Sequence, residues 1–265
     1  MKSPRLWRAA VCAAFAAVIV FVLALSTRAA ARLETATARA VEGRERTTQD
    51  PGVRGKYRSS PLALRDAQGT ILAFPPRPTT TRPLTVVYLH GIHGRAENGC
   101  PWLRDGASEI GWLVCPSANA PLANGTFSWG GTVAEQRAVV ARAERAAQAE
   151  GADAEGANVL VGFSQGAFVA LDLVRARLGR YRGLVLIGAD VEPARASLDQ
   201  AGVGRIVLAA GALDASFGPL QRAAARLRRE GMDVRFVDLG RIGHTYQTTD
   251  KEAFRDAIAW AGRSS

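Results

Sequence analysis

A serine flanked by glycines is the strongest chemical signal in this sequence. Ser164 lies within Gly-Phe-Ser-Gln-Gly at positions 162–166, between an apolar run and a stretch rich in helix-forming residues. In that strand–turn–helix setting the pattern forms a turn so tight that only glycine fits on either side of the serine. The turn presents the hydroxyl at a helix N-terminus, where backbone N–H groups and the helix dipole favour developing negative charge. Ser164 is therefore the predicted nucleophile.

A serine hydroxyl needs a general base, and His244 is the histidine best placed to serve as one. The sequence has 3 histidines, at positions 90, 93 and 244. The first two precede Ser164, whereas His244 follows the last strand-like run, in a loop that contains glycine. Such a loop would reach the carboxyl edge of a sheet, where His244 could accept the serine proton. The alternative is a surface histidine without a catalytic role.

An acidic side chain should orient the imidazole, and two aspartates follow strand-like runs. Asp214 comes after Ala-Ala-Gly-Ala-Leu at 209–213, and Asp190 follows the preceding run. We favour Asp214, because the acid is expected between the nucleophile and the histidine and near the last strands. Its carboxylate would fix the histidine tautomer and stabilise the imidazolium. Asp190 remains the alternative.

Backbone donors for an oxyanion are expected from the segment His-Gly-Ile-His-Gly at 90–94, which follows an early strand-like run. We expect the N–H groups of Ile92 and Gln165 to hold the oxyanion, with His93 as the next donor and a substrate contact. His90 is expected to brace the loop through hydrogen bonds. The sequence shows no clear partner ligands for a metal at these histidines, so no metal site is predicted.

The chemistry-bearing residues sit in a chain that alternates apolar runs with amphipathic stretches. Continuous apolar runs are typical of strands covered on both faces, and the β-α-β-α order predicts an α/β fold with a mainly parallel central sheet and helices on both faces. The strand-like runs are Leu84–Leu89, Gly111–Cys115, Asn158–Gly162, Gly183–Ile187, Arg205–Ala209 and Val234–Val237. The helical stretches are Val133–Ala149, Ala167–Arg177, Leu220–Glu230 and Glu252–Ala261, and an earlier hairpin includes Gly69–Ala73.

Together these motifs resemble the α/β-hydrolase superfamily over roughly residues 58–263. HGIHG at 90–94, GFSQG at 162–166, Asp214 and GHTY at 243–246 carry the resemblance, and GFSQG is similar to the carboxylesterase, acyl-thioesterase and dienelactone-hydrolase-like branch. The resemblance implies hydrolysis of an ester or thioester through an acyl-enzyme, with a small-molecule ester substrate and no cofactor. Lids in this fold usually insert before the fifth of the strand-like runs, where only Val191–Gly202 is available, so no large lid domain is expected.

A glycine-rich segment is a candidate for one wall of the substrate site. It spans residues 124–131, and its Phe127 and Trp129 could contact a substrate acyl or aromatic group. Both aromatic rings could equally pack the segment onto the sheet.

The N-terminus reads as a targeting segment. Lys2, Arg5 and Arg8 precede an uncharged apolar run at 9–25, which is typical of export. We expect residues 1–31 to be a signal peptide or membrane anchor, 32–57 a polar linker and 58–265 the catalytic domain. The domain would then be periplasmic, secreted or tethered to a membrane through residues 7–26. In an oxidising compartment Cys100 and Cys115 could form a disulfide, which the resembled branch does not require.

The composition limits the classes of partner that this protein is expected to bind. The formal net charge is +10 and the pI about 10.5, but the arginines are scattered and no dense basic run is interleaved with aromatics, so nucleic-acid binding is not expected. The sequence does not indicate an oligomeric state. Two other functions use the same fold: a peptidase or amidase with the same three residues, and a non-catalytic binding protein of the cell envelope.

Overall fold

The computed structural model describes residues 60–66, 69–248 and 250–263. The predicted targeting segment, 1–31, and the predicted linker, 32–57, lie outside the described residues. The strands are β1 (Leu62–Asp66), β2 (Gly69–Phe74), β3 (Leu84–Leu89), β4 (Gly111–Pro116), β5 (Ala120–Pro121), β6 (Phe127–Ser128), β7 (Asn158–Phe163), β8 (Tyr181–Ile187), β9 (Arg205–Ala210) and β10 (Asp233–Asp238). The helices are α2 (Ala96–Ala107), α3 (Val133–Ala149), α4 (Gln165–Arg175), α5 (Arg195–Gln200), α6 (Phe217–Arg229) and α7 (Lys251–Ala261).

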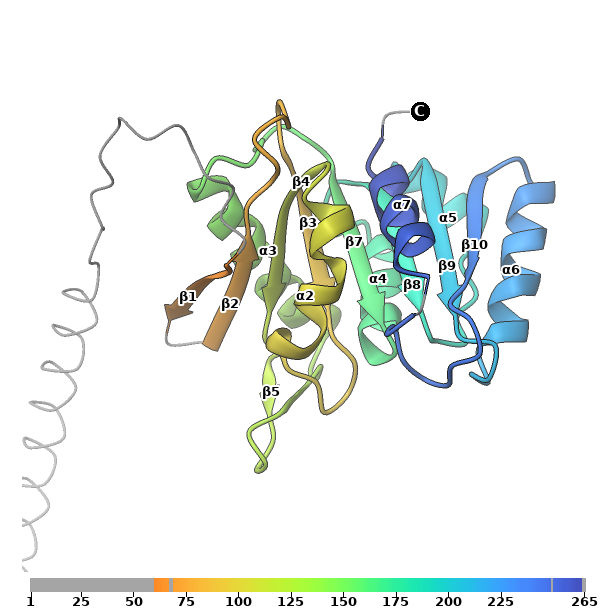
Figure 1. The fold of residues 1–265 in the computed structure, drawn as a ribbon, viewed down its shortest axis with the longest axis horizontal. Coiled ribbons are helices and arrows are strands. Elements are labelled where there is room, and N and C mark those ends of the chain that lie inside the picture. The colour runs from red at the N-terminus through yellow and green to blue at the C-terminus, as the bar shows by residue number, and fades with distance from the viewer. Residues whose placement is uncertain (1–59, 67–68, 249, 264–265) are drawn as a thin grey trace, which may run out of the picture. The chain divides into compact units, whose positions relative to one another are not determined.

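A mainly parallel sheet forms the centre of the described residues. Its strand order is β1-β2-β4-β3-β7-β8-β9-β10 (Figure 1). Within this sheet β4, β3, β7, β8, β9 and β10 pair in parallel, whereas β2 is antiparallel to both β1 and β4. The short strands β5 and β6 pair antiparallel with each other outside it. The central strands β3 and β4 are buried along their whole length and β8 along nearly all of it, because helices cover both faces, which explains their continuous apolar runs. The parallel arrangement brings the carboxyl ends of β3, β7, β8 and β9 to one edge.

Helices on the two faces enclose separate cores. Residues of α2 and α7 pack into one core, and residues of α3, α4, α5 and α6 pack into the other. The predicted α/β class, with helices on both faces of the sheet, is thus confirmed. The connection between β8 and β9, where a lid would insert, contains the short helix α5. Of the helices that the structure describes, none is long and apolar enough to span a bilayer.

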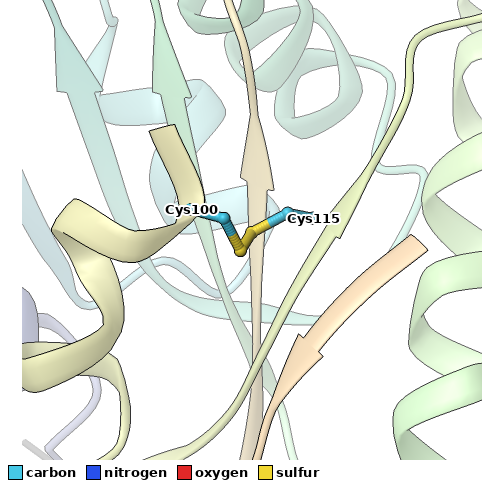
Figure 2. Close-up of a disulfide and its surroundings, with 2 residues drawn as sticks. All are labelled: Cys100 and Cys115. Atoms are coloured by element: carbon cyan, nitrogen blue, oxygen red, sulfur yellow. A yellow bond between two sulfur atoms is a disulfide. The ribbon is translucent and has the colours of Figure 1, made fainter. Parts of the chain in front are cut away.

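Helix α2 was not predicted, and a disulfide attaches it to the sheet. It contains Pro101 and further poor helix formers, among them Asn98, Gly99 and Gly106, so its sequence has little helix propensity. The helix nevertheless buries one side, and Cys100 bonds to Cys115 of β4, as expected from the sequence (Figure 2). Tertiary contacts and the disulfide therefore hold this segment helical.

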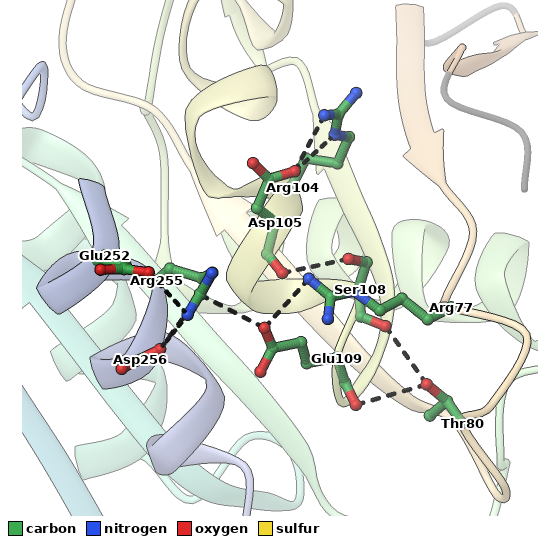
Figure 3. Close-up of polar contacts among 9 residues, drawn as sticks. All are labelled: Arg77, Thr80, Arg104, Asp105, Ser108, Glu109, Glu252, Arg255 and Asp256. Carbon is green, nitrogen blue, oxygen red and sulfur yellow. Dashed lines mark hydrogen bonds and ion pairs between the residues drawn. The ribbon is translucent and has the colours of Figure 1, made fainter.

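Charged side chains join the end of α2 to α7. The Glu109 carboxylate lies 3.2 Å from the Arg77 guanidinium and 3.4 Å from that of Arg255 on α7 (Figure 3). Partly exposed ion pairs of this kind contribute little to stability. The packing of α2 against α7 therefore rests mainly on their buried apolar side chains.

Candidate active site

Ser164 occupies a strained turn between β7 and α4. Its φ of 53° and ψ of −120° lie outside the regions that side chains other than glycine usually adopt. The chain closes on itself so tightly here that a β-carbon on Gly162 would lie 2.3 Å from the carbonyl oxygen of Gly166. A β-carbon on Gly166 would lie 2.1 Å from the carbonyl oxygen of Leu89. Both flanking glycines are therefore required by close backbone approach, as the motif predicts.

His244 lies between Ser164 and Asp214. The imidazole Nδ1 is 2.8 Å from the Asp214 Oδ2, and Nε2 is 2.9 Å from the Ser164 Oγ. A carboxylate only accepts hydrogen bonds, so Nδ1 carries the proton and donates it to Asp214. The lone pair of Nε2 is then free to accept the hydrogen bond from the Ser164 hydroxyl. The structure thus brings together the three residues that the sequence singled out, in the geometry of a nucleophile, its base and an orienting acid.

The Asp214 carboxylate is held in its ionised form. Its side chain is only 4% exposed, and burial by itself raises the pKa of the carboxyl. Hydrogen bonds from the Ser216 N–H, from His244 and from the Ser216 hydroxyl outweigh burial, so the net pKa of Asp214 is below its usual value. Both Ser216 donors reach Oδ1 at 2.9 Å. Oδ2 remains for His244. The Ser216 contribution was not anticipated from the sequence.

The loops after β9 and β10 are bonded to each other, which explains why Asp214 rather than Asp190 meets the histidine. The N–H of Ala212 donates to the carbonyl of Gly240, and that of Leu213 donates to the carbonyl of Ile242. These bonds place Asp214 beside the loop that contains His244. Asp190 follows β8 and is exposed at the same edge.

Phe163 was not predicted as a site residue, although it precedes the nucleophile. Its ring lies 5.0 Å from the His244 ring, tilted by 36°, and 4.7 Å from the ring of Tyr246. The Phe163 ring therefore packs against the imidazole of His244, whose Nδ1 is bonded to Asp214. Its position inside the glycine motif was the available signal, but nothing in the sequence paired it with residues 244–246.

Two backbone N–H groups are available for an oxyanion. Gly91 to Gly94 form a turn closed by a bond from the Gly94 N–H to the Gly91 carbonyl, with His93 at a φ of 55°. A β-carbon on Gly91 would lie 3.1 Å from the Ser164 Cβ, so this loop borders the nucleophile directly. Within the part of the chain that the structure describes, the N–H groups of Ile92 and Gln165 donate to no protein acceptor. The His93 side chain is exposed.

His90 braces this loop, as expected. The Ala118 N–H donates to its Nε2 at 3.1 Å, so the Nδ1 carries the proton and donates it to the Gly91 carbonyl at 2.8 Å. Burial lowers the pKa of His90, against smaller opposing effects of the Gly91 carbonyl and Glu97. Both ring nitrogens are thus committed to the backbone. Among the described residues, no three His, Cys, Asp or Glu side chains gather as metal ligands would.

The two aromatic residues of the candidate wall differ in their surroundings. Trp129 is only 5% exposed, and its indole N–H donates to the His90 carbonyl at 2.9 Å. Of the two roles left open for it, the structure favours packing over substrate contact. Phe127 is half-buried at the margin of the same core, and its N–H donates to the Gly94 carbonyl at 3.0 Å.

Comparison with known proteins shows the fold. No protein-family model and no curated protein matches the sequence. An uncharacterized protein from Bacillus cereus superposes with a TM-score of 0.58 at 15% identity, over 69% of this chain and 61% of that one. The chain therefore spans less than two thirds of that protein. It is also similar to an S-formylglutathione hydrolase from Staphylococcus aureus, with a TM-score of 0.53, 17% identity and coverage of 77% and 98%. A carboxylesterase from Bacillus cereus gives a TM-score of 0.51, 19% identity and coverage of 72% and 93%.

These neighbours, the parallel sheet and the serine turn after β7 define the class of structure. The chain has the α/β-hydrolase fold, as the sequence resemblance implied. Ligands of such sheets bind beyond the carboxyl ends of the strands, which is where Ser164, Asp214 and His244 meet.

Proposed function

We propose that this chain is an exported serine hydrolase that cleaves a carboxylic ester or thioester through an acyl-enzyme on Ser164. The observation that carries the proposal is the continuous hydrogen-bonded series from the Ser164 Oγ through His244 to Asp214 at the carboxyl edge of the sheet. Two similar structures, described as a hydrolase and a carboxylesterase, add support.

In the proposed reaction, the Ser164 Oγ attacks the substrate carbonyl carbon while its proton passes to the His244 Nε2. The oxyanion accepts hydrogen bonds from the N–H groups of Ile92 and Gln165, and Asp214 stabilises the imidazolium. Collapse of the tetrahedral intermediate expels the alcohol or thiol, which takes the proton from His244. A water molecule, activated by the same imidazole, then attacks the acyl-enzyme and releases the carboxylic acid.

Exposed apolar side chains border the proposed site. Of the described residues, only Ile92, Phe168 and Leu213 are large, apolar and exposed. Ile92 is 54% exposed next to Gly91, and Leu213 is 64% exposed next to Asp214. Exposed apolar side chains next to Gly91 and Asp214 suit an ester with a short hydrocarbon group near the scissile bond better than a strongly charged one.

Export is part of the proposal. The basic start and apolar run at positions 1–25 motivate it, and the buried Cys100–Cys115 disulfide is the kind of bond that persists in oxidising compartments. Cell fractionation followed by N-terminal sequencing of the mature protein tests it. A new N-terminus near residue 32 supports a cleaved signal, and an intact chain in the membrane fraction supports an anchor. An intact chain in the cytoplasm would contradict export.

Ester turnover tests the chemistry. The full chain in mild detergent is assayed on p-nitrophenyl acetate, butyrate and octanoate, beside Ser164→Ala and a fluorophosphonate label. Turnover and labelling that both disappear in Ser164→Ala are expected. A folded protein that takes no label would point to a binding protein without catalysis, whereas labelling with hydrolysis of matched amides but not esters would point to an amidase.

A further inference from the structure

The β5–β6 hairpin is bonded to both flanks of the loop that carries Ile92. The Ala118 N–H, just before β5, donates to the His90 Nε2. The Phe127 N–H donates to the Gly94 carbonyl, and the Trp129 indole donates to the His90 carbonyl. The hairpin and the loop at 90–94 therefore form one hydrogen-bonded unit.

The side chain of Gln165 joins this unit to the nucleophile turn. Its Oε1 accepts from the Ser128 Oγ at 3.0 Å and from the Trp129 N–H at 3.0 Å, and its Nε2 donates to the Trp129 carbonyl at 3.0 Å. The orientation of the amide is determined, because a flipped amide would set its NH₂ group against the Trp129 N–H. Gln165 is half-buried, and its bonds span 36 and 37 positions in the chain.

The location of these bonds gives them a meaning beyond tying down a loop. Gln165 directly follows Ser164, and its own N–H is one of the two proposed oxyanion donors. Figure 1 shows the β5 segment extending past the end of the sheet toward which the β7 strand points, and β7 leads into Ser164. A segment that extends there and is held by the residue beside Ser164 lies next to the proposed site.

We propose that Gln165 is a positioning residue, whose side-chain amide holds the β5–β6 hairpin as a fixed wall beside Ser164, and that this wall sets which ester groups fit. The inference rests on the proposed function and adds to it a residue that determines specificity. The physical basis is that three neutral hydrogen bonds replace water contacts and keep the hairpin in one position, so that a poorly fitting group clashes instead of displacing it.

Gln165→Met tests the proposal, because methionine has a similar length but cannot make these bonds. The specificity ratio is defined as kcat/KM for the preferred p-nitrophenyl ester divided by that for the least preferred of acetate, butyrate and octanoate. We expect the ratio to fall at least about fivefold in Gln165→Met, with a raised KM for the preferred ester. Titration with fluorophosphonate corrects each value for the fraction of active protein.

Two further variants serve as matched controls. Ser128→Ala removes one of the three bonds and should give a smaller fall in the ratio. Gln136→Met removes another glutamine bond to the same segment, from its Nε2 to the Gly130 carbonyl at 3.4 Å, but does not involve Gln165. It should leave the ratio unchanged. Labelling rates with short-chain and long-chain fluorophosphonates provide the same ratio without ester turnover.

A ratio in Gln165→Met within twofold of wild type would overturn the inference. So would an equal loss on all three esters, which indicates a general structural or oxyanion defect, and so would a wild type that does not discriminate among them. Absence of both ester turnover and phosphonate labelling in wild type is a distinct result, because it overturns the proposed function and the inference together.

Discussion

The Cys100–Cys115 bond offers the clearest quantitative test of the structure. The test compares the stability of wild type with that of the double variant Cys100→Ala/Cys115→Ala. Both side chains are fully buried, so alanine is preferable to serine, which would place two hydroxyl groups without partners in the core. The double variant removes the covalent bond between α2 and β4 without substituting any residue of the proposed active site.

The expected loss follows from the size of the closed loop. The bonded cysteines are 15 residues apart, and a loop of that length restricts the unfolded chain by about 3 kcal/mol in the chain-entropy model. Loss of two packed sulfur atoms acts in the same direction. In domains of this size each 1 kcal/mol shifts Tm by about 2–4 °C, so the double variant should melt roughly 6–12 °C below wild type.

Differential scanning calorimetry under non-reducing conditions measures this difference. Wild type that is unfolded, reduced and refolded in reductant should melt near the double variant. A Tm of the double variant within about 2 °C of that of wild type would contradict this prediction, because the disulfide would then not restrict the unfolded chain as the chain-entropy model requires.

Three further predictions concern the site and its support. Asp214→Asn should lower kcat/KM on the preferred ester about 10³–10⁴-fold, whereas Asp190→Asn should stay within about twofold; equal losses in steady-state assays would reject the assignment of Asp214. Gly166→Ala places a β-carbon 2.1 Å from a carbonyl oxygen of β3 and should cost roughly 3 kcal/mol or more, while Gly243→Ala, which meets nothing within 4 Å, should cost less than about 0.5 kcal/mol. Calorimetry decides this, and similar values for both variants would contradict the close approach. Because burial lowers the pKa of His90, the unfolded chain binds a proton that the folded chain refuses, so this contribution to stability is full above about pH 6.5 and declines as the pH falls below it. Tm measured between about pH 7.5 and 5.5 should therefore fall less steeply in His90→Gln than in wild type, and parallel slopes would contradict this account.

Strands were the part of the fold most accessible from sequence. Leu84–Leu89 was predicted with the observed bounds, and the other five parallel strands were placed within two residues of theirs. In the central strands the side chains are buried on both faces, so the apolar pattern is nearly continuous and breaks where the strand ends. The helix Val133–Ala149 was also predicted with its observed bounds, and in the structure a capping box at Thr132 marks its start.

Segments stabilised by tertiary contacts were missed. Helix α2 contains Pro101 and Gly99, and its helical state depends on burial against the sheet and on the bond from Cys100. The hairpin strands β5 and β6 have two residues each and no recognisable period. Contacts made by the Gln165 amide lie 36 positions or more away in the chain, and a single sequence contains no record of them.

The choice between Asp214 and Asp190 shows where sequence reasoning about the site reaches its limit. Both aspartates follow a parallel strand, so both are expected at the same edge of the sheet. What separates them is the pair of backbone bonds that joins the loop after β9 to the loop containing His244, together with the two Ser216 donors that occupy one carboxylate oxygen. Such bonds depend on loop conformation, which residue types do not determine.

The partners of the two imidazoles explain why His244, and not His90, is the proposed base. At His90 the Nε2 lone pair already accepts the Ala118 N–H, and burial disfavours the cation that proton uptake would create. At His244 the Nε2 lone pair faces the Ser164 hydroxyl, and the Asp214 carboxylate accepts the hydrogen bond from Nδ1. The His244 side chain is also 53% exposed, so a substrate can approach it. The two imidazoles are chemically identical, but their partners make one a brace for the loop and leave the other placed for the proposed proton transfer.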